Sequence, residues 1–155
     1  MSGPVNMPQF VKELSRRPKA RAAVVLTQEY EGQQEWAEKL ARQTDADHIN
    51  LLDLFLKEPA LSNNIESFSV QSFFNYLKEK SQAPVLIISG MEFLKATWTS
   101  QPRATQEFVS RIQTWNQNPG LLFILQYDKL IVTYDFGSRY RQYIFVVHQN
   151  DTLAL

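Results

Sequence analysis

The sequence contains no cysteine among its 155 residues. That absence excludes disulfide bonds, thiol catalysis and cysteine metal sites, and it is compatible with the reducing cytosol. The formal net charge is zero, with 16 basic and 16 acidic residues. The chain therefore lacks the basic excess that is typical of dedicated nucleic-acid-binding or membrane-surface proteins. Its apolar runs are short, such as that over residues 85–88, and none has the length that a membrane span needs.

The first residues do not combine a charged start with an apolar run, so no secretory signal is visible. We therefore expect a soluble, cytoplasmic protein without membrane contacts. The hydrophobic content of 44% is enough for a packed core. The length suits one domain, and we divide the chain into an N-terminal arm, residues 1–21, and a single α/β domain, residues 22–155.

Apolar stretches alternate with helical patterns along most of the chain. We predict strands near 22–27, from 48, and near 84–89 and 121–126, with helices near 32–46, near 69–80 and from 102. Residues 51–56 also suit a short helix. The tail suggests two more strands, near 129–134 and 141–148. This order predicts a three-layer α/β fold, with a mostly parallel sheet, helices on both faces and a C-terminal β-hairpin. Ligands in such sheets bind beyond the carboxyl ends of the strands.

A degenerate phosphate-binding loop follows the first strand. A Walker A loop reads G-x-x-x-x-G-K-[ST] between a strand and a helix. With Gly32 at the second glycine, Thr27 stands at the first glycine, Gln33 at the lysine and Gln34 at the Ser/Thr. Three glutamates lie between positions 29 and 35, and each would repel a phosphate 4 Å away by about 1 kcal/mol in water. We expect this loop to bind no nucleotide.

The third strand lacks the second element of a nucleotide site. A Walker B strand is an apolar run that ends in a magnesium-supporting aspartate. Here Ser89 takes that position and Gly90 follows it. Glu92 could replace the aspartate only if the backbone turned it back. We therefore expect no catalytic residue, metal or cofactor, on a P-loop NTPase-like fold of the RecA/AAA-like kind. The alternative is an ordinary α/β protein that never carried the motif.

Other polar clusters are weaker indicators. His48 and His148 are the only histidines, and we interpret both as structural. Gln126 resembles a polar sensor residue, or it caps the next turn. The candidate partner-binding residues come from the basic arm and from the aromatic-basic tail, where Tyr and Arg are typical interface anchors. They are Arg16, Arg17, Arg139, Tyr140, Arg141 and Tyr143. The alternatives are a solvated linker for the arm and a half-buried hairpin for the tail.

The chain resembles BrxF-like small P-loop proteins of BREX phage-defence systems. The resemblance lies in residues 23–34, in the segment 85–94, and in the tail segments 130–134 and 140–143. In that family the third strand ends in an acidic residue and is followed by a Glu-apolar pair. Glu92-Phe93 fits the pair, whereas Ser89 departs from the acid. The resemblance implies a role in prokaryotic antiviral defence, as an accessory to larger protein components.

Three functional hypotheses follow. The first is a non-catalytic pseudo-ATPase that serves as an assembly subunit, through self-association or docking on a larger subunit. The second is a divergent ATPase or nucleotide switch that uses ATP and Mg²⁺, with a cation supplied by Arg103, Arg111 or Arg139. The third is a nucleic-acid-binding accessory protein that uses the arm (Arg16, Arg17, Lys19 and Arg21) with Arg139 and Arg141. The substitutions in the loop and in the third strand favour the first hypothesis.

Overall fold

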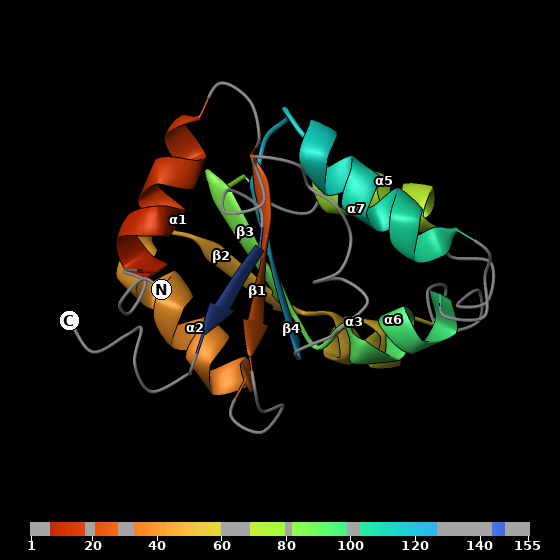
Figure 1. Cartoon of the computed structure of the whole chain (residues 1–155). Helices are drawn as coiled ribbons and strands as arrows, with labels where there is room; N and C mark the ends of the chain where they lie inside the picture. Colours follow the sequence, from red (N-terminus) through yellow and green to blue (C-terminus); the bar gives the residue numbers. More distant parts are fainter. Residues whose placement is uncertain are drawn as a thin grey trace.

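The structure is a computed structural model, and it describes residues 7–17, 21–27, 33–59, 69–79, 82–98, 103–126 and 144–147. Within these ranges the molecule has three layers, with a central sheet and helices on either side (Figure 1). The expectations for Gly32, His148, Arg139, Tyr140, Arg141 and Tyr143 lie outside the described residues.

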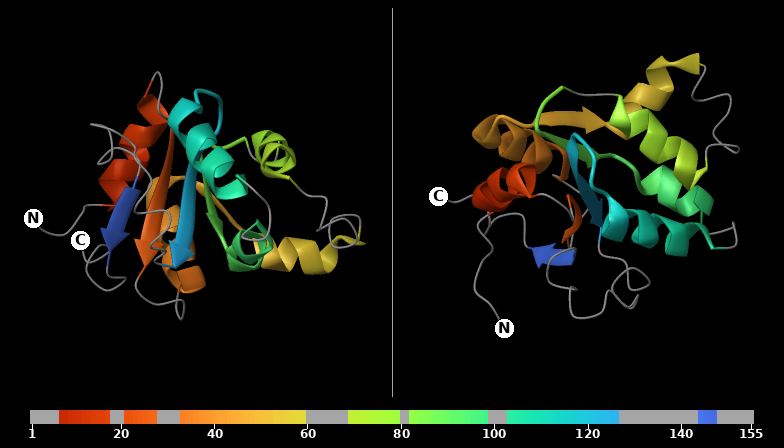
Figure 2. Two further views of the ribbon diagram at one scale, coloured as in Figure 1. Left: turned by 45° about the vertical axis from the view of Figure 1, so that its right-hand side comes forward. Right: turned by 90° about the horizontal axis from the view of Figure 1, so that it is seen from above.

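The central layer is a five-stranded sheet in the order β5-β1-β4-β3-β2. Every neighbouring pair is parallel, and Figure 2 shows β5, β1 and β4 side by side with their arrowheads in one direction. The strands are β1 (Ala22–Thr27), β2 (Asp47–Asn50), β3 (Val85–Ser89), β4 (Gly120–Gln126) and β5 (Ile144–Val147). The three central strands are nearly continuous apolar runs because helices cover both of their faces.

Two helices cover one face of the sheet, α1 (Met7–Arg16) and α2 (Gln33–Thr44). In α1 the apolar side chains Phe10, Val11 and Leu14 recur at helical spacing and are buried. They share a core cluster with alternate residues of the central strands, including Val25 and Ile87. The expected arm, residues 1–21, therefore contains a helix that is packed into the domain.

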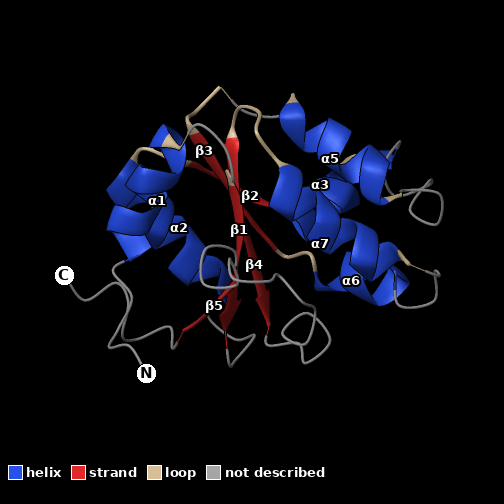
Figure 3. Ribbon diagram, turned by 45° about the horizontal axis from the view of Figure 1, so that its top comes forward, coloured by secondary structure: helices blue, strands red, loops and turns tan. Residues whose placement is uncertain are grey.

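Among the described residues, the opposite face is covered by α3 (Leu51–Lys57), α5 (Val70–Lys78), α6 (Glu92–Trp98) and α7 (Ala104–Thr114). Figure 3 shows the two helical layers on either side of the strands. The core on this side is largely aromatic, because the ring of Phe123 on β4 contacts Phe73, Phe74 and Phe108 at centroid distances of 5.1 to 5.9 Å. Such tilted and edge-on ring pairs are the favoured arrangements.

The parallel sheet with helices on both faces confirms the coarse fold prediction. The sequence left the end of the second strand open, because residues 51–56 also suit a short helix, and the structure has that helix. The strand ends at Asn50 because the side chain of Asn50 accepts a hydrogen bond from Asp53 N at 3.1 Å and caps α3.

The expected C-terminal hairpin lies only partly within the described residues. The strand β5 is the described portion of the predicted strand 141–148, and it pairs with β1 in parallel. The predicted partner strand, 129–134, lies outside the described residues. In the described part of the tail, the chain therefore extends the parallel sheet.

Candidate functional site at the carboxyl edge of the sheet

The carboxyl ends of the strands bring the predicted site residues to one edge of the molecule. Thr27, the last residue of β1, is in register with Gln126, the last residue of β4. At the β2 end of the strand order, Asn50, the last residue of β2, is in register with Ser89, the last residue of β3. The chain leaves β1 toward the layer of α2, whereas it leaves β3 toward the layer of α6 and α7. In open α/β sheets, ligands bind beyond the carboxyl ends of the strands.

Gln33, which the motif alignment sets at the Walker lysine, is the first residue of α2. Gln33 is only 2% exposed, whereas Gln34 and Glu35 next to it are exposed. A neutral amide is therefore buried where a P-loop lysine would extend toward phosphate oxygens. The exposed carboxylate of Glu35 lies in the first turn of α2, where it already interacts favourably with the positive end of the helix dipole.

Ser89, which the motif alignment sets at the Walker aspartate, is fully buried and its hydroxyl is hydrogen-bonded. Ser89 Oγ lies 2.6 Å from Nε2 of His48 on β2, and it donates to the carbonyl oxygen of Ile49 at 3.5 Å. A neutral hydroxyl engaged by protein groups is a poor ligand for a hard divalent cation, which takes carboxylates. Glu92 begins α6 and is partly buried.

Backbone geometry fixes the turn after β3. Gly90 has a φ of +68°, a left-handed conformation that costs other residues about 1–2 kcal/mol. Its carbonyl oxygen accepts a hydrogen bond from Leu52 N at 3.1 Å. A Cβ at position 90 would collide with Oδ1 of Asn50, the residue that caps α3. A glycine at this position therefore lets β3 end directly beside the start of α3.

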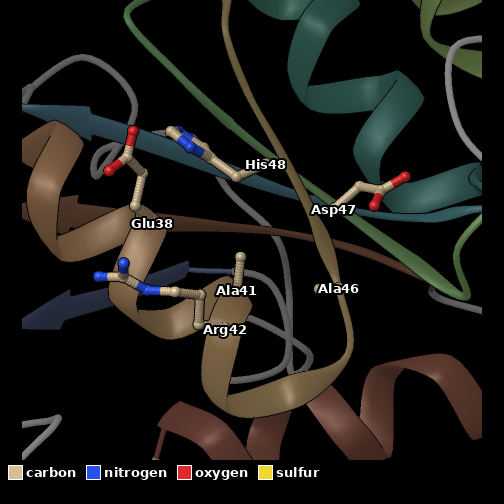
Figure 4. Close-up of a pocket in the computed structure, with 6 residues that line it drawn as sticks. All are labelled: Glu38, Ala41, Arg42, Ala46, Asp47 and His48. Atoms are coloured by element: carbon tan, nitrogen blue, oxygen red, sulfur yellow. The ribbon is translucent and has the colours of Figure 1, made fainter.

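Among the described residues, His48 is the one titratable side chain whose pKa is clearly shifted from its ordinary value. Burial lowers the pKa of His48 below its ordinary value of 6.5, and the carboxylate of Glu38 on α2 acts in the opposite direction. The imidazole lines an open hollow of about 320 Å³. The other lining residues are Glu38, Ala41, Arg42, Ala46 and Asp47 (Figure 4). The sequence predicted a structural histidine, but the contact with Ser89, which lies 41 positions away, could not be read from it.

The basic candidates lie elsewhere. Arg16 and Arg17 stand at the end of α1 that precedes β1, which places them toward the amino edge of the sheet. Arg16 is exposed, and the guanidinium of Arg17 lies over the ring of Phe10 at 5.2 Å. Arg103 is exposed before α7, and Arg111 forms an ion pair with Glu107 at 3.7 Å. The described residues thus bring Ser89 and His48 together but not the basic residues.

Comparisons with known proteins found no matching family model, no matching curated protein and no matching solved structure. In the ranges that the structure describes, no helix is long and apolar enough to cross a membrane. The same ranges hold no group of three or more His, Cys, Asp or Glu side chains arranged to bind a metal ion.

Proposed function

We propose that the chain is a P-loop-like domain of the RecA/AAA-like kind that has lost nucleotide chemistry. The strand order β5-β1-β4-β3-β2 supports this fold, because RecA/AAA-like domains place the loop-bearing first strand between the fourth and the fifth. The helix after β1 also begins where the degenerate motif puts it, at Gln33. This support is a fold-level analogy, and the function has to be argued from the site.

The observation that carries the proposed loss of chemistry is the burial of Ser89. In an active site of this kind, a carboxylate at the end of the third strand supports Mg²⁺, and the loop lysine neutralises the outer phosphates. Here Ser89 is fully buried and hydrogen-bonded to His48, and Gln33 is buried as well. Among the described residues of this segment, the remaining favourable group is the end of one helix, worth about 0.3–1 kcal/mol for a favourable charge. That is far less than the roughly 8 kcal/mol that micromolar binding requires.

We propose that such a domain serves as a non-catalytic assembly subunit of an antiviral defence complex of the BREX kind. The sequence resemblance over residues 23–34, 85–94 and the tail supports this role. The partners would be larger protein subunits or further copies of the chain, and the contacts would come from Arg16 and Arg17 together with the aromatic-basic tail. Co-purification of the tagged chain with the subunits of such a complex, from a host that carries one, tests this role. Retention of those subunits by a variant with both arm arginines and the four tail residues changed to alanine would contradict the assignment.

Titration calorimetry with ATP and Mg²⁺ tests the loss of nucleotide chemistry. The natural chain is expected to give no binding heat at micromolar protein. A variant with Gln33→Lys, Gln34→Thr and Ser89→Asp restores the missing groups and is expected to gain measurable affinity. A control with Gln43→Lys, an exposed residue near the far end of α2, adds a lysine to the same helix away from the loop and should gain nothing. Micromolar binding by the natural chain that disappears with Gln33→Ala would overturn the proposal.

A further inference from the structure

The short helix α3 carries more apolar side chains than its contact with the core uses. Leu51 and Phe55 are buried, and the ring of Phe55 contacts that of Phe93 at a centroid distance of 5.1 Å. Leu52 and Leu56, each one position further along, are 37% and 74% exposed. A helix that is apolar around most of its circumference is normally buried on all sides. The core therefore accounts for one face of α3 and leaves a second apolar face in solvent.

Leu52 and Leu56 differ from the rest of the described surface. Among the described residues, they are the large hydrophobic side chains that are exposed. They are four positions apart, so they are neighbours on one side of the helix, whereas exposed apolar residues that are scattered singly need no explanation. Figure 2 shows α3 projecting outward at the end of its helical layer. We call this pair of leucines the α3 ridge, and its position makes it accessible to another molecule.

Two opposite charges flank the α3 ridge on one side. Asp53 and Lys57 are exposed, and each directly follows one of the two leucines, so they form a row beside the ridge. In two antiparallel helices related by a two-fold axis, this flank faces the same flank of the other copy in reversed order. Asp53 of each copy then lies opposite Lys57 of the other, and Leu52 lies opposite Leu56. Parallel helices would instead put like charges face to face. The charge pattern is therefore complementary to itself in the antiparallel arrangement.

We propose that the α3 ridge is a contact between two copies of this chain, which pair their α3 helices antiparallel to each other around a two-fold axis. The inference does not depend on the proposed function. Two leucines per copy bury far less than the roughly 800 Å² per partner of a standard interface, so the dimer is weak and forms only at high concentration. Because α3 begins directly after the last residue of β2, the contact lies next to the carboxyl edge of each sheet.

Sedimentation equilibrium of the full chain tests this contact. The natural chain is expected to pass from monomer toward dimer between about 10 μM and 1 mM, as a small interface allows. Leu56→Ala should raise the dissociation constant by about tenfold or more, because a two-fold contact loses the side chain twice. The variant should fold normally, because this side chain is 74% exposed. A chain that stays monomeric over the whole range, as expected if a different protein or another part of the chain covers the ridge, would overturn the proposal. So would a dimer that Leu56→Ala leaves unchanged.

Charge variants test the direction of the pairing independently. Lys57→Glu leaves only acidic groups on the flank and Asp53→Lys only basic ones, so each variant alone should dimerise about threefold to tenfold more weakly than the natural chain. An equal mixture of the two should associate as tightly as the natural chain, and so should the double variant, in which the charges are exchanged. Lys39→Glu makes the same charge change on α2, in the opposite helical layer, and should leave the dissociation constant unchanged. A mixture that associates no better than its two components would contradict the antiparallel pairing.

Discussion

Replacement of Gly90 by alanine should cost about 2–3 kcal/mol of unfolding free energy. The left-handed backbone, with a φ of +68°, accounts for about 1–2 kcal/mol in any residue with a Cβ. The new Cβ would also collide with Oδ1 of Asn50 and lie 2.8 Å from its Cγ. Asn50 must then turn away and give up its bond to Asp53 N, and the loss of such a helix cap costs about 1 kcal/mol.

Urea denaturation of four proteins separates these two contributions. The natural chain, Gly90→Ala, Asn50→Ala and the double variant form a cycle that measures the coupling between the two residues. Because the loss of the cap is common to both single variants, the double variant should be less destabilised than their sum, by about 1 kcal/mol. A cost below about 0.5 kcal/mol for Gly90→Ala, or strict additivity in the cycle, would refute the reasoning.

The remaining predictions concern the stability of the same fold. Because the pKa of His48 is lowered in the folded state, its contribution to stability is fully present above pH 6.5 and is lost as the pH falls from 6.5 toward the folded pKa. The free energy of unfolding falls by at most about 1.4 kcal/mol per pH unit over this range. Urea denaturation between pH 5 and pH 8 measures this fall, which should be absent from His48→Gln because its side chain does not titrate. Phe123→Ala should cost about 3–5 kcal/mol, because the ring is fully buried among other aromatic rings. Leu56→Ala, at a side chain that is 74% exposed, should change the free energy of unfolding by less than about 0.5 kcal/mol.

Much of the fold could be predicted from local patterns. The apolar runs of β3 and β4 are buried on both faces, and continuous runs of that kind indicate parallel strands between helical layers. The helix after residue 50 could also be expected from the sequence. An asparagine before the apolar residues Leu51 and Leu52, with Asp53 in the first turn, is a typical helix start. The sheet order needed the structure, because no local signal states which strand lies beside β1.

The residue types at the candidate site could be predicted from the sequence, but the contacts between those residues could not. The substitutions at Gln33 and Ser89 can be read directly from the motif positions. The hydrogen bond that occupies Ser89 comes from His48, a residue 41 positions earlier, and it depends on the register in which Asn50 opposes Ser89. A shift of that register by one residue would turn His48 to the opposite face. Sequence alone therefore gives the residue types at the motif positions but not the contacts that those residues make.

Introducing a carboxylate with Ser89→Asp should reverse the pH dependence of stability. An aspartate beside Nε2 of His48 would favour the protonated ring and raise its folded pKa above 6.5. A contribution from a raised pKa is fully present below the unfolded pKa and is lost as the pH rises through the folded pKa. The variant should be less stable than the natural chain at pH 8, because burying a carboxylate in the place of Ser89 is costly. That difference should shrink on acidification, where the natural chain loses stability and the ion pair forms. Urea denaturation of both proteins between pH 5 and pH 8.5 measures how the free energy of unfolding changes with pH in each. Equal slopes of this free energy against pH would mean that the side chain at position 89 does not set the charge state of His48.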